Sequence, residues 1–487
     1  MDDFVIAVEN NDLKSVKNLI HNNANVNTKN INDWSVLQIA TENGNLEIVK
    51  ELINNNADIN SGDIIGWTPL HIASQYNKYE IAKELINANA NVNIQENENG
   101  LTPLHMATGK GYLEIVKELI NANANVNIKN DYESWTPLHN AVCWSHLDIM
   151  IELLKNKVNV NAQNEDGSTP LHFAAESGDL NIVKHLINSN ANIKLETNSK
   201  ETILSIATKY GHLDLVKYFI SFNYDFNLHN HKNNPIHIAS KKGNLEILKE
   251  LLKLNVDVNI LSEENCNALH YASQYKNNNE IVRELIKANV NVNLQGTNYE
   301  LTPLHMATKK GNFEIAKTLI NNNANINIKN ILGNTPLNIA IEKKHFELAN
   351  ELLKANANIN IVNNEKIHPI HNASKSGSID LLQKFLKLNV DINIQDKRGY
   401  TPLHFAIQFN RINIVNELLK QNANVSIEAS YGRTPMIIAR YFGNKQILNL
   451  LKRYQYNQYK TIILSLLRHN IPIEIGEYIA NMVFDIK

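Results

Sequence analysis

Residues 302–307 read Thr-Pro-Leu-His-Met-Ala, and this stretch decides the fold because the chain repeats it. The string Thr-Pro-Leu-His occurs intact at Thr68, Thr102, Thr136, Thr169, Thr302 and Thr401. Degenerate copies begin at Ser35, Thr202, Asn234, Asn267, Thr335, His368 and Thr434. We call the first residue of each copy an anchor, and successive anchors lie 32–35 residues apart. One more unit without an anchor opens the chain, since Ala7 lies 33 residues before Ala40, so the sequence predicts about 14 repeats.

Each repeat has the pattern of two helices. The fifth residue after every anchor is Ala, whose small side chain lets the first helix approach its neighbour closely. Pro lies in the first helical turn, where its missing N–H costs nothing. A second segment with helical apolar spacing follows, as in residues 45–53. It ends at Asn in twelve of thirteen copies, with Lys157 the exception, and Asn is the best residue after Gly for a left-handed helix end.

Thr-Pro-Leu-His-x-Ala at a period of 33 is the signature of ankyrin repeats, so residues 1–455 resemble an ankyrin-repeat protein. The resemblance implies an all-α solenoid of about 14 helix-turn-helix units with protruding hairpin loops, which we call fingers. Stacked repeats share one continuous core, so one elongated domain replaces the roughly three domains expected from length alone. It also implies a non-enzymatic protein that binds protein targets on its concave face. We expect it to be a monomer.

Composition excludes several other classes of protein. Lys and Arg number 47 against 49 Asp and Glu, which argues against nucleic-acid and membrane-surface binding. No apolar run approaches the ~20 residues of a membrane span, and the acidic start is unlike a secretory signal. Cys143 and Cys266 lie four repeats apart and are expected to be free thiols in a reducing compartment. We expect a cytoplasmic location, or the host cytosol if the protein is secreted as an effector.

Nine anchors carry His at their fourth position, which invites a catalytic or metal-binding interpretation. In ankyrin repeats this imidazole hydrogen-bonds the backbone of neighbouring loops. Successive copies should lie about 10 Å apart in stacked helices, too far to share a zinc ion. We therefore expect no catalytic residue, metal or cofactor. Asn is over-used throughout, as the codon bias of an A+T-rich genome would produce.

Two sets of residues are candidates for partner binding. The residues seven and eight positions after each anchor should line the concave face, and in six consecutive repeats they include Lys209, Lys241, Lys242, Lys309, Lys310, Lys343 and Lys375. Glu342 is the only carboxylate among them. They form either a basic stripe for an acidic partner or a set of solvated lysines. The second set is Trp34, Trp67 and Trp135 near the fingertips and Trp144 on the concave face, which either contact a partner or pack on adjacent fingers.

The repeat pattern stops at residue 456, which divides the chain into a solenoid (1–455) and a tail (456–487). A short helix is predicted over 459–467 and a second one from residue 471 on. The sequence Ile471-Pro472-Ile473-Glu474-Ile475, with Ile479 in the following apolar stripe, resembles the head of an F-box. Truncated F-boxes close ankyrin proteins of poxviruses (the PRANC type) and of some intracellular bacteria. Here Ile replaces the leading Leu, and only 12 residues follow Ile475.

This resemblance gives the first functional hypothesis. The residues that match the motif are Ile471, Pro472, Glu474 and Ile475, and with Ile479 they would bind a Skp-type adaptor of cullin–RING ubiquitin ligases. The solenoid would then be a substrate receptor, as in an effector of an intracellular bacterium or large virus. The alternative is a plain ankyrin scaffold or inhibitor whose tail only caps the last repeat and has no link to ubiquitin.

Overall fold

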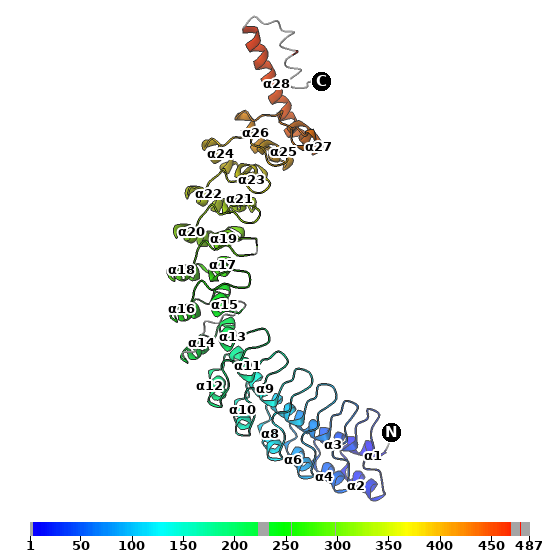
Figure 1. Cartoon of the computed structure of the whole chain (residues 1–487). Helices are drawn as coiled ribbons and strands as arrows, with labels where there is room; N and C mark the ends of the chain where they lie inside the picture. Colours follow the sequence, from blue (N-terminus) through cyan, green and yellow to red (C-terminus); the bar gives the residue numbers. More distant parts are fainter. Residues whose placement is uncertain (1–2, 223–232, 255, 298, 469–477, 479–487) are drawn as a thin grey trace. The chain divides into compact units, whose positions relative to one another are not determined.

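The computed structural model describes residues 3–222, 233–254, 256–297, 299–468 and 478. Within these residues the chain is all-helical apart from two isolated β-bridges, Lys29 with Ser35 and Ala429 with Arg433. It divides into two compact units, residues 1–226 and residues 227–487. The predicted all-α architecture is therefore confirmed, and each unit is a stack of helix pairs (Figure 1).

Seven helix pairs make up the first unit, and odd-numbered helices are the first of each pair. They are α1 (Asp3–Glu9), α2 (Leu13–His21), α3 (Val36–Asn43), α4 (Leu46–Asn54), α5 (Pro69–Gln75), α6 (Tyr79–Asn87), α7 (Pro103–Lys110), α8 (Leu113–Asn121), α9 (Pro137–Cys143), α10 (Leu147–Leu154), α11 (Pro170–Ser177), α12 (Leu180–Asn188), α13 (Ile203–Tyr210) and α14 (Leu213–Ile220). The pair α1–α2 is the predicted repeat without an anchor. Odd helices pack on odd helices from α1 to α13, and even helices pack on even helices from α2 to α10.

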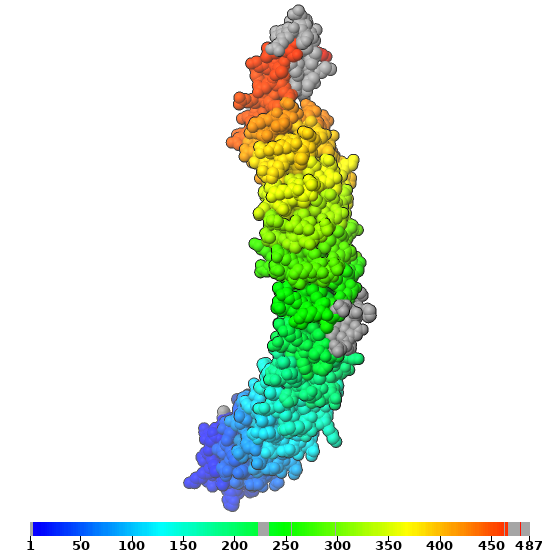
Figure 2. All heavy atoms as spheres, turned by 90° about the vertical axis from the view of Figure 1, so that its left-hand side faces the viewer, coloured from blue at the N-terminus to red at the C-terminus, as the bar shows by residue number. Residues whose placement is uncertain are grey.

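The second unit has the same organisation. Its helices are α15 (Pro235–Lys242), α16 (Leu245–Leu252), α17 (Ala268–Ser273), α18 (Asn279–Lys287), α19 (Pro303–Lys310), α20 (Phe313–Asn321), α21 (Pro336–Glu342), α22 (Phe346–Lys354), α23 (Pro369–Ser376), α24 (Ile379–Lys387), α25 (Pro402–Gln408), α26 (Ile412–Lys420), η1 (Ser430–Gly432), α27 (Pro435–Tyr441) and α28 (Lys445–Arg468). The fingers extend from the side of the odd helices (Figure 1), and Figure 2 shows the surface of this unit from the side of the even helices, with the sequence colours following one another along the stack. Stacking continues from α17 to α19, across the 35-residue spacing.

The anchor residue starts each first helix by capping it. In α19, Thr302 has an extended backbone, its Oγ1 accepts a hydrogen bond from the His305 N–H, and Pro303 opens the helix. Gly311 ends the helix at φ 74°, in the left-handed region. The fifth residue after the anchor, Ala307, is completely buried, as are its twelve counterparts. Ala at this position therefore allows the close approach of helices that the sequence predicts.

The asparagines that end the second helices adopt the left-handed conformation. Positive φ values of 54–67° occur at Asn23, Asn56, Asn89, Asn123, Asn190, Asn289, Asn323, Asn356, Asn389 and Asn422. Lys157, the exception in the sequence, has the same conformation at φ 50°. Asn223 and Asn255 lie outside the described residues. The prediction is confirmed at every described position.

A second set of asparagines links consecutive fingers. The side-chain oxygen of Asn93 accepts the Asn125 N–H at 2.7 Å, and that of Asn293 accepts the Asn325 N–H at 2.7 Å. Seven further bonds of this kind, 2.7–2.9 Å long, involve the side chains of Asn27, Asn60, Asn127, Asn161, Asn259, Asn327 and Asn393. Codon bias is therefore not needed to explain these asparagines, because a short amide acceptor is what the position requires.

The carboxyl end of the second unit differs from the prediction. A single helix, α28, runs from Lys445 to Arg468, so residues 459–467 are its last part and not a separate short helix. The reason lies at residue 455, where the repeat spacing calls for the Asn that ends a second helix. Gln455 stands there instead, and Gln is a good helix former. The predicted boundary between residues 455 and 456 falls inside this helix.

One repeat carries a polar side chain that its site does not satisfy. Asn338 occupies the position of the anchor histidines, is completely buried, and neither atom of its amide has a hydrogen-bond partner among the described residues. In the preceding repeat, His305 Nε2 contacts a loop carbonyl at 3.1 Å. The amide of Asn338 is shorter than an imidazole and does not make the corresponding bond in its own repeat.

We expect Asn338→His to raise the free energy of unfolding by about 1–3 kcal/mol at neutral pH, because it satisfies a buried polar group that is now unpaired. Chemical unfolding followed by circular dichroism measures the change. Asn338→Gln should act in the same direction, because Gln38 makes both bonds in its own repeat: Oε1 accepts the Ser35 N–H at 2.8 Å, and Nε2 donates to the Trp67 carbonyl at 2.7 Å. Lower stability in both variants would contradict this explanation.

Candidate functional site

The row of anchor histidines forms the backbone links between repeats. His305 Nδ1 accepts the N–H of its anchor Thr302 at 3.2 Å, so the ring proton lies on Nε2, which donates to the Asn334 carbonyl at 3.1 Å. Nε2 makes the equivalent bond, 2.9–3.2 Å long, at His71, His105, His139, His172, His237, His270, His371 and His404. The predicted structural role of these histidines is confirmed.

Burial keeps these imidazoles neutral. It lowers the pKa to about 4 at His71, His105, His139, His172, His270, His305, His371 and His404. Protonation would also put a proton on Nδ1, which accepts the anchor N–H. Across the part of the chain that the structure describes, no three His, Cys, Asp or Glu side chains are grouped to hold a metal ion.

The two cysteines are free thiols, as predicted, and both are shielded. Cys266 is buried and Cys143 half-buried. Burial raises the pKa of Cys143 and raises that of Cys266 to about 11. Thiolate is the reactive form, so neither residue has the environment of a nucleophile.

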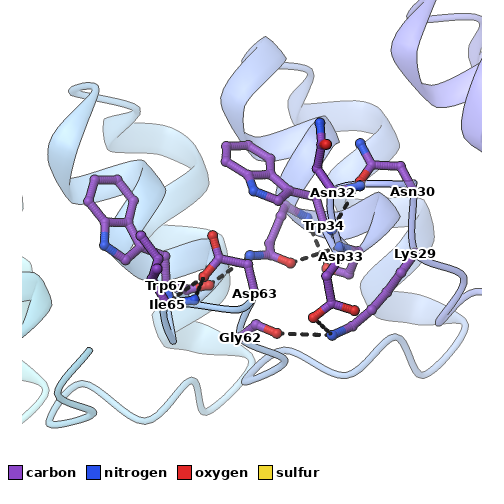
Figure 3. A network of polar contacts seen from close by, with 11 residues as sticks. Lys29, Asn30, Asn32, Asp33, Trp34, Gly62, Asp63, Ile65 and Trp67 are labelled. Carbon is purple, nitrogen blue, oxygen red and sulfur yellow. Dashed lines mark hydrogen bonds and ion pairs between the residues drawn. The ribbon is translucent and has the colours of Figure 1, made fainter. Parts of the chain in front are cut away.

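The first two fingers place Trp34 and Trp67 side by side (Figure 3). The Asn30 side chain accepts the Trp34 N–H at 3.0 Å, and Asp63 accepts the Trp67 N–H at 2.8 Å, which closes each hairpin. Lys29 joins the two fingers, since Nζ donates to the Gly62 carbonyl at 3.1 Å. The two indole rings project in the same direction from successive fingers, and both are half-buried.

The other two tryptophans have different surroundings. Trp135 is half-buried, and its ring meets that of Phe173 edge-on at 4.9 Å, so it packs on the next repeat. Trp144 follows α9 at the end of a first helix, and 63% of it is exposed. Of the four tryptophans, Trp144 is therefore the most exposed.

Six of the seven predicted lysines lie on one surface of the second unit. We define the helix-end face as the side chains seven to nine positions after each anchor, at the carboxyl ends of the odd helices. In five consecutive repeats it carries Lys241, Lys242, Lys276, Lys309, Lys310, Lys343, Lys344 and Lys375, with Glu342 as its only carboxylate. All are exposed except Lys375, which is half-buried. Lys276 and Lys344 were missed by the sequence prediction, which covered only two positions per repeat.

The described residues do not neutralise the charges on the helix-end face. None of these eight lysines is ion-paired with a carboxylate of the described residues. In the second helices from α16 to α26, most lysines are different, because they pair with a carboxylate one turn earlier. Examples are Lys249 with Glu246 at 2.8 Å and Lys287 with Glu284 at 2.7 Å. The lysines of the helix-end face therefore differ from most lysines of the second helices from α16 to α26, because they make no ion pair with a described carboxylate.

Lys209, in the first unit, does not share this property. Its Nζ lies 2.9 Å from the Glu201 carboxylate, so its charge is already matched. The neighbouring Tyr210 donates to the Glu176 carboxylate, and this hydrogen bond together with burial raises the pKa of the phenol to about 12. Lys209 is therefore excluded from the unpaired set.

Sequence analysis also missed an aromatic pattern on the same face. The position eight residues after the anchor is aromatic in six repeats, and all six side chains are exposed: Tyr76, Trp144, Tyr210, Tyr275, Phe409 and Phe442. In four more repeats the position is Lys. The signal was available in the sequence, because comparing one position across all thirteen anchors reveals it. Three of these side chains belong to each unit, and exposed aromatic side chains at equivalent positions of a repeat are typical of a contact surface.

Comparison with known families decides the classification. A family model described as ankyrin repeats (3 copies) matches residues 4–96, 83–164, 148–230, 206–296, 269–363 and 370–461. The chain belongs to the ankyrin-repeat family. None of the curated proteins compared with it matches. As a protein of ankyrin repeats, it carries a protein–protein interaction module, and ankyrin-repeat proteins are generally non-enzymatic scaffolds.

Two other predictions for this ankyrin-repeat protein concern its F-box-like residues and membrane-spanning helices. The F-box-like residues lie outside the described residues; they are Ile471, Pro472, Glu474, Ile475 and Ile479. Their adaptor-binding role stays a prediction. No helix in the described ranges is long and apolar enough to cross a membrane.

Proposed function

We propose that this protein captures a partner protein by an acidic segment that lies along the helix-end face of residues 227–487. The observation that carries the proposal is the set of eight lysines without a carboxylate partner in five consecutive repeats. Such a row creates a positive potential that attracts acidic segments and orients them. The partner's carboxylates would meet Lys side chains that need not first break an internal ion pair.

The even-helix side of the same unit is a poorer candidate. Most of its lysines are held by intrahelical partners, as in Lys253 with Glu250 at 2.9 Å and Lys354 with Glu351 at 3.3 Å. An acidic partner there would have to compete with a carboxylate on the same helix. A bound protein gains little from such an exchange, because exposed pairs of this kind contribute well under 1 kcal/mol each.

A salt titration with a defined probe tests the proposal. The seven odd helices from α15 to α27 should span roughly 50–60 Å at the usual helix spacing, which an extended peptide of about 16 residues covers. We expect a fluorescein-labelled Glu/Asp peptide of that length to bind, and its affinity to fall about tenfold or more between ~0.05 M and ~0.5 M NaCl. Affinity that does not change with salt would contradict the proposal.

The finer hypothesis, in which the tail links the captured protein to a Skp-type adaptor and a ubiquitin ligase, is supported by the F-box-like motif in the sequence alone. It requires a captured target, so it presupposes the interaction proposed above. The alternative, a scaffold or inhibitor without a ubiquitin link, uses the same helix-end face and differs only in the role of residues 456–487. Whether the protein is an effector stays equally a prediction.

A further inference from the structure

The last repeat, anchored at Thr434, carries a group of exposed apolar side chains among its described residues. Its first helix, α27, and the adjoining segments leave large apolar side chains in solvent. Tyr431 is 93% exposed, Tyr441 83%, Phe442 50% and Ile437 46%. Exposed apolar side chains gathered in one place mark a binding surface.

This repeat is also the most basic part of the chain. Residues 429–468 contain no Asp or Glu, and they contain seven basic residues: Arg433, Arg440, Lys445, Lys452, Arg453, Lys460 and Arg468. Arg433 stands among the aromatic side chains, with its guanidinium 5.6 Å from the Tyr431 ring and Nη1 3.1 Å from the Tyr400 hydroxyl. An apolar ligand at this site is therefore expected to carry negative charge.

The repeat has a pocket of a size to hold one side chain. Its volume is about 100 Å³, several times what a water molecule requires. Tyr400, Ile437, Ile438 and Phe442 supply apolar walls, and Arg433 and Gln408 supply polar groups. Aliphatic and aromatic walls next to a cation suit a leucine or phenylalanine side chain flanked by carboxylates.

The pocket and the lysines of the helix-end face are neighbours. Helix α23 packs on α25, and α25 packs on α27, so the face continues without interruption into the last repeat. Lys375, the last lysine of the row, places Nζ 5.2 Å above the ring of Phe409. Phe442 belongs both to the helix-end face and to the pocket. A single extended segment can therefore contact the lysines and the pocket together.

We propose that the partner of this protein is an acidic segment that ends in a large apolar side chain, and that the pocket of the last repeat holds this side chain as an anchor. The inference rests on the proposed function, since the acidic part must lie along the lysines. It adds the kind of side chain that the partner carries at one end, and the pocket in which that side chain binds.

The test uses the full chain and four probes of equal length. Two are acidic peptides of about 16 residues with a Leu-Phe pair at the amino or the carboxyl end, the third has Ala-Ala instead, and the fourth is a single-stranded DNA. We expect one Leu-Phe peptide to bind about 10- to 100-fold more tightly than the Ala-Ala peptide. In the variant Tyr441→Ala with Phe442→Ala this advantage should vanish, and it should vanish equally in Ile437→Asp.

Tyr76→Ala is the matched control, because Tyr76 occupies the corresponding position of a repeat in the first unit, and it should leave the advantage intact. Equal affinity for all three peptides, an advantage that survives in both pocket variants, or tighter binding of the DNA would overturn the inference. The failure of every peptide to bind would contradict the proposed function itself. Salt-sensitive binding without an anchor effect would contradict only this inference.

Discussion

Acidification from about pH 7 to about pH 4.5 is expected to destabilise the repeats strongly, because eight of them depend on a buried neutral histidine. These imidazoles have a pKa of about 4 in the folded protein, against about 6.5 in an unfolded chain. Between these two values the unfolded chain binds more protons than the folded one. The free energy of unfolding therefore falls as the pH falls, by up to about 1.4 kcal/mol per pH unit for each histidine.

The pH range over which stability is lost follows from the same two pKa values. Above about pH 6.5 both states are neutral at these positions, and the stabilisation is fully present. It is lost progressively down to about pH 4, below which both states are protonated. Each such repeat should lose up to about 3 kcal/mol, and since repeat stabilities add along a stack, the whole array should unfold in acid.

Gln38 supplies the control for this prediction, because it makes the two histidine bonds with a side chain that does not titrate. We expect stability to depend on pH about half as steeply, with little change at pH 7.5, in a variant that carries His270→Gln, His305→Gln, His371→Gln and His404→Gln. Urea unfolding at several pH values measures this, and amide exchange locates it, since the repeat of Gln38 should keep its protection in mild acid. Parallel stability curves for the variant and the wild type would show that the histidines are not the cause.

Repetition explains why so much of the fold could be predicted from the sequence. Thirteen copies of the anchor constrain one another, so the helix pairs, the buried Ala residues such as Ala307 and the backbone role of His305 all followed from spacing and residue type. The left-handed conformation of Lys157 did not follow from the sequence, in which this residue was only the exception to the Asn pattern.

The features that could not be predicted depend on which residue is the hydrogen-bond or ion-pair partner of a side chain. The finger-to-finger bond of Asn93 joins residues 32 positions apart, and no local pattern in the sequence indicates it. Likewise, Lys209 and Lys309 occupy the same position in their repeats, but only Lys209 meets a carboxylate. The presence or absence of a carboxylate partner distinguishes lysines that are already ion-paired from lysines of a candidate binding surface. Only the structure shows which lysines have such a partner.

Charge reversal on the helix-end face is the second large effect that we expect. Lys241, Lys242, Lys309 and Lys310 are exposed and make no ion pair with the described carboxylates. Changing all four to Glu should weaken binding of the acidic peptide with the Leu-Phe anchor by about 100-fold or more, because attraction becomes repulsion along the face. Thermal unfolding should change little, since exposed charges contribute little to folding.

If the helix-end face binds the acidic segment, the position of its lysines, and not the net charge of the protein, sets the affinity. The most direct test measures the affinity of the anchored acidic peptide for two variants of equal net charge. One carries Glu at the four lysines of the helix-end face, and the other carries Glu at four lysines of the even helices, Lys249, Lys253, Lys287 and Lys354. We predict that the first variant loses binding about 100-fold and the second by no more than about threefold. Equal losses in both variants, or no loss in either, would contradict the account.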